Sequence, residues 1–222
     1  PDTDGYVLTR YEDINTVVKD PVRFPPTLSL GIQALLDSGV PPEEAPLTNA
    51  MLASMATLRP TNELYRTHRQ ELTDPWVEPG ASRHTEMIAR HANALIDEWI
   101  DRGEMDFIHE FARPLPQRVM ASVLGFPQED IPRLAEWGTA QVEAFVHGRT
   151  HRNLLTDDQI RAQFEKLDGF KEYVYAWVKE KRANPKDDMI SWLCQVEYQA
   201  LGRKLTDLEV NGVVYAMLIG GL

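Results

Sequence analysis

The last stretch of the chain, Leu205–Leu222, carries the most restrictive helix pattern in the sequence. Thr206 and Glu209 have the spacing of a capping box, in which each side chain accepts a hydrogen bond from the backbone N–H of the other residue, so a helix begins here. From Val210 onward, Asn211 is the one strongly polar residue. The pattern therefore predicts a helix that is buried on nearly all sides, around which the rest of the chain must pack.

This helix pattern ends on the pair Gly220 and Gly221. Each glycine destabilises a helix interior by about 1 kcal/mol relative to alanine, which favours a place where a ligand or another backbone approaches the helix closely. A helix that simply ends at a C-cap glycine is the alternative interpretation. The sequence leaves both interpretations open.

Composition restricts the class of protein. The 222 residues carry a net charge of −11, which argues against a nucleic-acid partner, because such a partner requires a basic face. The single cysteine, Cys194, excludes an internal disulfide and fits a reducing compartment. Apolar stretches are too short to span a bilayer, and no leader pattern opens the chain, so we expect a cytoplasmic protein without a membrane segment.

Helical periodicity dominates the chain and predicts one mainly α-helical domain over residues 1–222. Thr156 and Gln159 form a second capping box, and Pro114 and Pro116 are expected to kink or restart the helix that contains them. The expected elements are a strand at 5–10 and helices at about 11–20, 62–73, 82–102, 107–124, 128–146, 156–182, 187–199 and 206–222.

The segment between residues 24 and 60 is rich in both proline and apolar residues, among them Leu28, Leu30 and Met55. A long, irregular and hydrophobic connection is typical of a segment that covers a ligand pocket. Packing against its own core is the alternative.

Several familiar motifs are absent from the sequence: a glycine-rich phosphate loop, a Gly-x-Ser-x-Gly elbow and a Cys-x-x-Cys pair. His147 and His151 have the i,i+4 spacing of metal ligands, but their polar surroundings indicate an exposed loop. The pairs Asp157-Asp158 and Asp187-Asp188 resemble magnesium-binding stretches of all-α isoprenoid synthases, yet they fit helix N-termini better. We therefore predict no metal ligands among the side chains of this chain.

Six short segments follow one another in a specific order and spacing: Tyr6-Val-Leu-Thr-Arg-Tyr11, Asp20-Pro-Val-Arg-Phe24, Phe111-Ala-Arg-Pro-Leu-Pro116, Leu124-Gly-Phe-Pro127, Leu205-Thr-Asp207 and Ile219-Gly-Gly-Leu222. Together they resemble the N-terminal half of a bacterial-type cytochrome P450, a haem-thiolate monooxygenase, over nearly the whole chain. The glycine pair is most similar to that of the camphor hydroxylase type. The resemblance implies the P450 fold, a helical prism with a small β-sheet, of which these residues form an incomplete domain.

The resemblance also implies a haem b cofactor, whose cysteine ligand is expected beyond Leu222. In the family, a His and, four residues later, an Arg bind a haem propionate, because a planar cation matches a carboxylate. One register places Leu64 and His68 in these positions, and the other places Tyr65 and Arg69. We prefer the second, since it continues without a gap, and an ordinary surface role for Arg69 is the alternative.

By the same resemblance, Gly220 and Gly221 open the groove for dioxygen, and Met217 and Gly221 lie against the haem. Residues expected around the substrate share an apolar character: Leu28, Leu30, Met55, Val142, Phe145, Ala216, Met217 and Ile219. The implied function is hydroxylation of a small to medium hydrophobic substrate with dioxygen and electrons from a ferredoxin-type donor. A non-catalytic helical protein that binds a ligand or partner without haem is the alternative.

Overall fold

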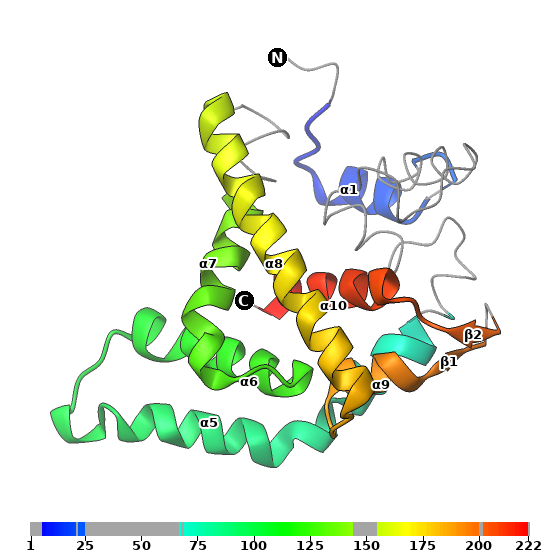
Figure 1. The fold of residues 1–222 in the computed structure, drawn as a ribbon. Coiled ribbons are helices and arrows are strands. Elements are labelled where there is room, and N and C mark those ends of the chain that lie inside the picture. Colours follow the sequence, from blue (N-terminus) through cyan, green and yellow to red (C-terminus); the bar gives the residue numbers. More distant parts are fainter. Residues whose placement is uncertain are drawn as a thin grey trace.

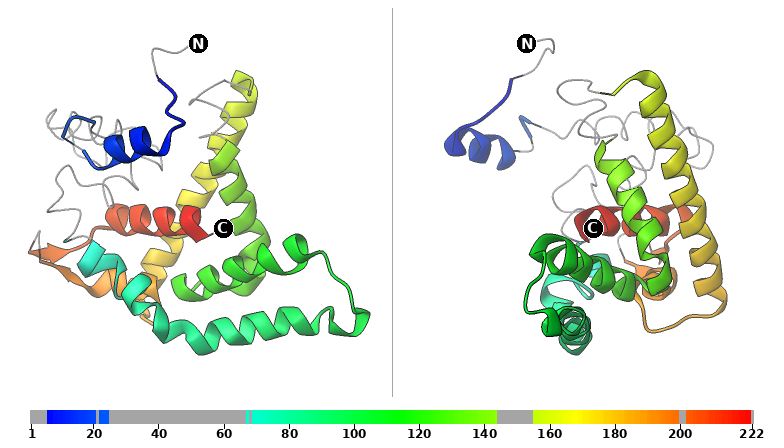
Figure 2. Two further views of the ribbon diagram at one scale, coloured as in Figure 1. Left: turned by 180° about the vertical axis from the view of Figure 1, so that it is seen from behind. Right: turned by 90° about the vertical axis from the view of Figure 1, so that its left-hand side faces the viewer.

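The computed structural model describes residues 6–20, 22–24, 67, 69–143, 155–199 and 202–221. Helices dominate this part of the chain, as the sequence predicts (Figure 1). At its centre lies α10 (Asp207–Gly221), which contacts α6 (Pro114–Leu124), α7 (Ile131–Val142), α8 (Asp157–Ala183) and α9 (Met189–Gln195). Figure 2 shows from two further sides that α10 lies between α6 and α8.

The predicted capping box begins α10. The Thr206 Oγ1 accepts a hydrogen bond of 3.2 Å from the backbone N–H of Glu209, and Glu209 Oε2 accepts one of 2.9 Å from the N–H of Thr206. Val210, Asn211 and Val213 are fully buried. The expectation of a central, enclosed helix is therefore confirmed.

The longest helix, α8, has 27 residues and begins at the predicted capping box of Thr156 and Gln159. It runs past α7, α9 and α10 (Figure 1). Its buried face carries Phe170, Val174 and Val178 at the i,i+4 spacing that one side of a helix requires. This stripe explains why α8 packs on the core over its length.

Aromatic rings fill the layer between α7, α8 and α10. The ring centroid of Trp137 lies 5.3 Å from that of Phe170 and 5.1 Å from that of Tyr173, and Phe170 lies 5.8 Å from Tyr215 of α10. Such tilted pairs stabilise a core beyond the burial of their area. The hydroxyl of Tyr173 donates a hydrogen bond of 2.6 Å to Asp130, which ties α8 to the start of α7.

A buried ion pair joins α8 to α9. The Lys181 ammonium pairs with the carboxylate of Asp188, and their side chains are 2% and 5% exposed. Asp188 also accepts a hydrogen bond of 2.8 Å from the backbone N–H of Ser191, so it is the N-cap of α9. The sequence analysis assigns this carboxylate to a helix N-terminus, which the structure confirms, but the partner Lys181 is not evident from the sequence.

Gly125 ends α6 beside this ion pair, with a φ of +82° that disfavours every residue with a side chain. A Cβ at this position would overlap the carboxyl group of Asp188. Three helices, α6, α8 and α9, therefore meet at one carboxylate.

Several expected helices are divided in the structure. The predicted helix at 82–102 consists of a 3₁₀-helix (Glu78–His84), α5 (Thr85–Asp97) and a second 3₁₀-helix (Ile100–Arg102). The predicted helix at 107–124 consists of a π-helical turn (Ile108–Ala112) and α6, which restarts at Pro114 as the prolines indicate. Short helical segments at α1 (Tyr11–Val18), Arg69–Thr73 and Gln128–Asp130 complete the described helices.

The strand predicted at 5–10 is wrong, since its described residues, 6–10, form no strand. The helix expected up to residue 199 ends at Gln195. Within the described ranges, the strands are β1 (Glu197–Tyr198) and β2 (Arg203–Lys204), which pair antiparallel. Because a strand is stabilised by its neighbour, propensity in a single segment is a weak guide. None of the described helices is both long and apolar enough to cross a membrane.

We expect Asp188→Ala to lower the free energy of unfolding by about 3–5 kcal/mol, because it leaves the Lys181 ammonium buried without a partner. Asp187→Ala is the matched control, since Asp187 is 90% exposed and pairs with Arg83 at the surface, a contact worth less than about 1 kcal/mol. Urea denaturation of both variants measures the difference. Equal losses would contradict the central role of Asp188.

Candidate functional site

The open end of α10 is the first candidate site. Gly220 is exposed within the helix, and a Cβ built on it would meet no atom of the described residues within 4 Å. Its φ is not among the positive values of the chain, so neither packing in this part of the structure nor backbone conformation requires a glycine here. The space beside Gly220 therefore fits the approach of a group from outside these residues.

The side of α10 that carries Gly220 continues toward the middle of the helix. Ala216 and Met217 precede Gly220 by four and three residues, which places all three on one side of the helix. Both side chains are half-buried and pack against the core at their edges. The result is a narrow apolar strip that ends in an exposed backbone. The side chain of Ile219 lies outside the described residues, and Gly221 is the last residue of α10.

Arg69 is the expected propionate ligand. It begins a π-helical turn, and its Nε lies 3.3 Å from a carboxylate oxygen of Asp74 at the end of that turn. The side chains are 33% and 24% exposed, so the guanidinium is oriented by a neighbour and remains reachable from solvent. Tyr65 and His68 lie outside the described residues, so the choice between the two registers stays a prediction.

Trp76 organises the segment that follows Arg69. Its ring is 4% exposed, the Arg83 guanidinium lies 4.0 Å from the ring centroid, and His84 Nε2 lies 3.0 Å from its carbonyl oxygen. No described residue accepts a hydrogen bond from its indole N–H. The sequence signal for these contacts is that Arg83 and His84 follow Trp76 by seven and eight residues.

Cys194 has the properties of a structural residue. It is 3% exposed, its thiol points to the carbonyl oxygen of Val178 at 3.8 Å, and burial raises its pKa to about 11. A cysteine that binds haem iron does so as a thiolate, and this environment disfavours a thiolate. These properties agree with the expectation that Cys194 is not the iron ligand. Within the described residues, no three His, Cys, Asp or Glu side chains gather as metal ligands.

Known proteins resemble the chain at moderate identity, although no protein-family model matches it. Cyclomarin C epoxidase CymV of Salinispora arenicola is 30% identical over 221 residues, which cover 97% of this chain and 50% of that protein. The polyketide biosynthesis cytochrome P450 PksS of Bacillus subtilis is 30% identical over 135 residues, which cover 61% of this chain and 30% of that protein. The structure of the open cytochrome P450 Eryk from S. erythraea matches at a TM-score of 0.65 and 24% identity over 96% of this chain and 48% of that one.

The chain belongs to the cytochrome P450 family. It spans about half the length of CymV and less than a third of that of PksS. The expected fold class is confirmed, since the P450 architecture is mainly α with a small β contribution. The particular likeness of the glycine pair to the camphor hydroxylase type stays a prediction.

The remaining substrate-binding predictions for this P450 chain concern two regions. Val142, the last residue of α7, is 50% exposed and lines a hollow of about 410 Å³ between α6 and α7, together with Arg113, Gln117 and Thr139. Leu28, Leu30, Met55 and Phe145 lie outside the described residues. Their roles stay predictions.

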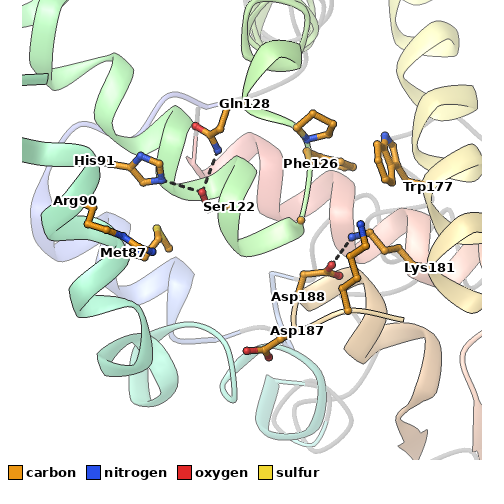
Figure 3. Close-up of a pocket in the computed structure, with 13 residues that line it drawn as sticks. Met87, Arg90, His91, Ser122, Phe126, Gln128, Trp177, Lys181, Asp187 and Asp188 are labelled. Atoms are coloured by element: carbon orange, nitrogen blue, oxygen red, sulfur yellow. Dashed lines mark hydrogen bonds and ion pairs between the residues drawn. The ribbon is translucent and has the colours of Figure 1, made fainter. Parts of the chain in front are cut away.

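A larger cavity, of about 640 Å³, opens elsewhere on the P450 chain, between α5, the end of α6, the end of α8 and residues 186–188 (Figure 3). On its wall, Ser122 Oγ lies 2.9 Å from His91 Nε2 and accepts a hydrogen bond of 3.0 Å from Gln128. We call it the α5–α8 cavity. No sequence pattern indicates this cavity, because its residues come from four separate segments.

The pKa of His91 in this cavity is lowered from its ordinary value of 6.5, first by burial and then by the charges of Arg118 and Arg90. The folded state therefore binds fewer protons than the unfolded state just below pH 6.5, and the free energy of unfolding falls as the pH drops through this range. NMR titration of the imidazole should give a pKa below 6.5. Arg118→Gln should raise it, and a pKa above 6.5 in the unaltered protein would contradict the assignment.

Proposed function

We propose that this chain forms the distal part of a haem-thiolate monooxygenase, in which the open end of α10 faces dioxygen and the substrate. The observation that carries the proposal is the space beside Gly220 that no described residue fills, on a helix whose other faces are buried. A glycine that its own protein surroundings do not require is expected where a bound group needs the space. Membership of the cytochrome P450 family supports the same interpretation.

Haem fits the residues at this end of the chain in part. Met217 and Gly221 would lie against the porphyrin, and the Arg69 guanidinium, oriented by Asp74, would hold a propionate together with Tyr65. In the other register, His68 would take the place of Arg69. The bound haem supplies the redox chemistry of dioxygen, which no amino-acid side chain provides. Cys194 is a buried thiol with a raised pKa, an environment that disfavours a thiolate, so it is not proposed as the iron ligand.

The proposed substrate is a small to medium hydrophobic organic molecule. Ala216 and Met217 offer it an apolar wall in the described residues, and Ile219, Val142, Phe145, Leu28, Leu30 and Met55 are the further residues proposed around it. Burial of such a substrate contributes about 25 cal/mol per Å² of apolar area. The two relatives are named for epoxidation and for polyketide biosynthesis, so the proposal extends to oxygen insertion and not to one reaction product.

Electrons are proposed to come from a ferredoxin-type donor, because oxygen insertion consumes two of them that the substrate does not provide. The chemistry of the family supports this proposal, and the described residues include no redox group of their own. A membrane-bound or nucleic-acid partner is not part of the proposal.

Carbon monoxide difference spectroscopy of the reduced native protein tests this function directly. We expect the spectrum of a haem with a thiolate ligand, unchanged in Cys194→Ser, because the buried thiol is not the ligand. A native protein without haem would favour the non-catalytic binding protein instead. Loss of the thiolate spectrum in Cys194→Ser would contradict the assignment of this cysteine to the core.

The role of Gly220 in turnover can be tested separately from its effect on stability. Gly220→Ala should raise the free energy of unfolding by up to about 1 kcal/mol, because the new methyl group meets no described atom, while product formation falls by about tenfold or more. Gly169→Ala in α8 is the matched control, since its Cβ would make an ordinary contact of 3.7 Å with Trp137. It should show a similar gain in stability and unchanged turnover. Equal turnover in both variants would contradict a role of Gly220 at the reacting groups.

A further inference from the structure

The α5–α8 cavity lies away from the open end of α10. In Figure 1, the start of α5 lies near the lower end of α8, whereas the C-terminal end of α10 lies beside α7. The cavity volume of about 640 Å³ falls within the range of roughly 300–1,000 Å³ that is typical of small-molecule sites. Its chemistry can therefore be considered independently of the proposed oxygenase function.

Two cationic side chains on the wall of this cavity lack a partner. Arg90 of α5 and Lys186 of the segment between α8 and α9 make no ion pair or side-chain hydrogen bond with any described residue. Other cations nearby are paired: Arg118, for example, lies 2.8 Å from Glu98. In a chain with a net charge of −11, two cations that line one cavity without an ion-pair partner among the described residues indicate an anionic occupant.

The acidic side chains of the cavity do not balance these charges. Asp188 is paired with the buried Lys181, and Asp187 lies 3.0 Å from the guanidinium of Arg83. Both carboxylates are thus neutralised by cations other than Arg90. The wall keeps an excess of positive charge.

The base of the cavity is apolar and carries two aromatic rings. Phe126 is 4% exposed, and its ring centroid lies 6.3 Å from that of the half-buried Trp177 in an edge-to-face arrangement. Met87 and Pro127 complete the apolar lining. Figure 3 shows Met87 and Trp177 on opposite sides of the cavity, with Phe126 between α6 and Trp177. A flat apolar group would gain both burial and ring contacts here.

The polar wall opposite is fixed in place. Because His91 and Gln128 both hold the hydroxyl of Ser122, this side of the cavity needs no rearrangement to receive a ligand. Inorganic phosphate would satisfy the two cations but leave the apolar base in water. A neutral aromatic molecule would cover the base but leave the cations without a partner.

We propose that the α5–α8 cavity binds an aromatic monocarboxylate, with the carboxylate held by Arg90 and Lys186 and the ring against Trp177 and Phe126. The pairing is of the charge-assisted kind that arginine favours. This site is separate from the α10 end, and it does not depend on whether the protein carries haem.

Isothermal titration calorimetry with 2-naphthoate on the native protein tests the proposal. We expect 2-naphthoate to bind, 2-naphthamide to bind at least about tenfold more weakly because it lacks the charge, and inorganic phosphate to displace 2-naphthoate poorly. Equal binding of the amide would overturn the role of the cations. Efficient displacement by phosphate would overturn the role of the aromatic base, and no binding of 2-naphthoate would overturn the site.

Variants locate the binding event. Arg90→Gln and Lys186→Gln should each weaken 2-naphthoate about three- to tenfold, and both side chains are exposed, so the variants should fold normally. Lys179→Gln is the matched control, because this exposed lysine of α8 does not line the cavity. Unchanged affinity in Arg90→Gln and Lys186→Gln would place the ligand elsewhere, for example at the α10 end, and would overturn the proposal. In a haem-loaded protein, binding at the α5–α8 cavity should leave the haem absorbance unchanged.

Discussion

The carboxylate of Asp188 is the contact on which the packing of several helices depends. It neutralises the buried Lys181 of α8, caps the first turn of α9 and fills the space left by Gly125 at the end of α6. Removing one partner of a buried ion pair costs far more than the pair contributes, because the other charge remains desolvated. The pair therefore specifies how three helices meet, even though an apolar replacement of both residues would be tolerated better than the loss of one.

The next residue after Lys181 connects this junction to the central helix. Arg182 donates hydrogen bonds to Asp207 at 2.6 Å, to the Leu205 carbonyl at 2.7 Å and to the Cys194 carbonyl at 2.9 Å. One side chain thus holds the segment that leads into α10 and the end of α9. Because α10 is positioned at its start by these contacts and along its length by the aromatic layer, its opposite end presents Gly220 in a fixed place. Because α10 is held in place, the open strip at its end is suited to position a bound reactive group against the exposed backbone at Gly220.

The two candidate sites differ in how they are built. The strip at α10 comes from one helix, with Ala216 and Met217 beside Gly220, and the family relationship gives it a chemical interpretation. The α5–α8 cavity is lined by two cations, Arg90 and Lys186, and by an aromatic base, which come from four segments of the chain. No sequence motif indicates it. Asp188 also affects this cavity. Because it pairs with Lys181, it does not neutralise Arg90 or Lys186, for which no described residue is an ion-pair partner.

The sequence by itself determined the features that depend on neighbours within one turn or one helix face. The capping boxes at Thr156 and Thr206 begin α8 and α10 because donor and acceptor lie three residues apart, and the restart at Pro114 follows from its missing N–H. Order and spacing of short segments also gave the family, and with it Gly220 as a candidate. Only the tertiary structure decided that Lys181 meets Asp188, that β1 pairs with β2 and that no described residue fills the space beside Gly220. Those outcomes depend on what other segments place opposite a residue, and hydrophobic periodicity carries no information about that partner.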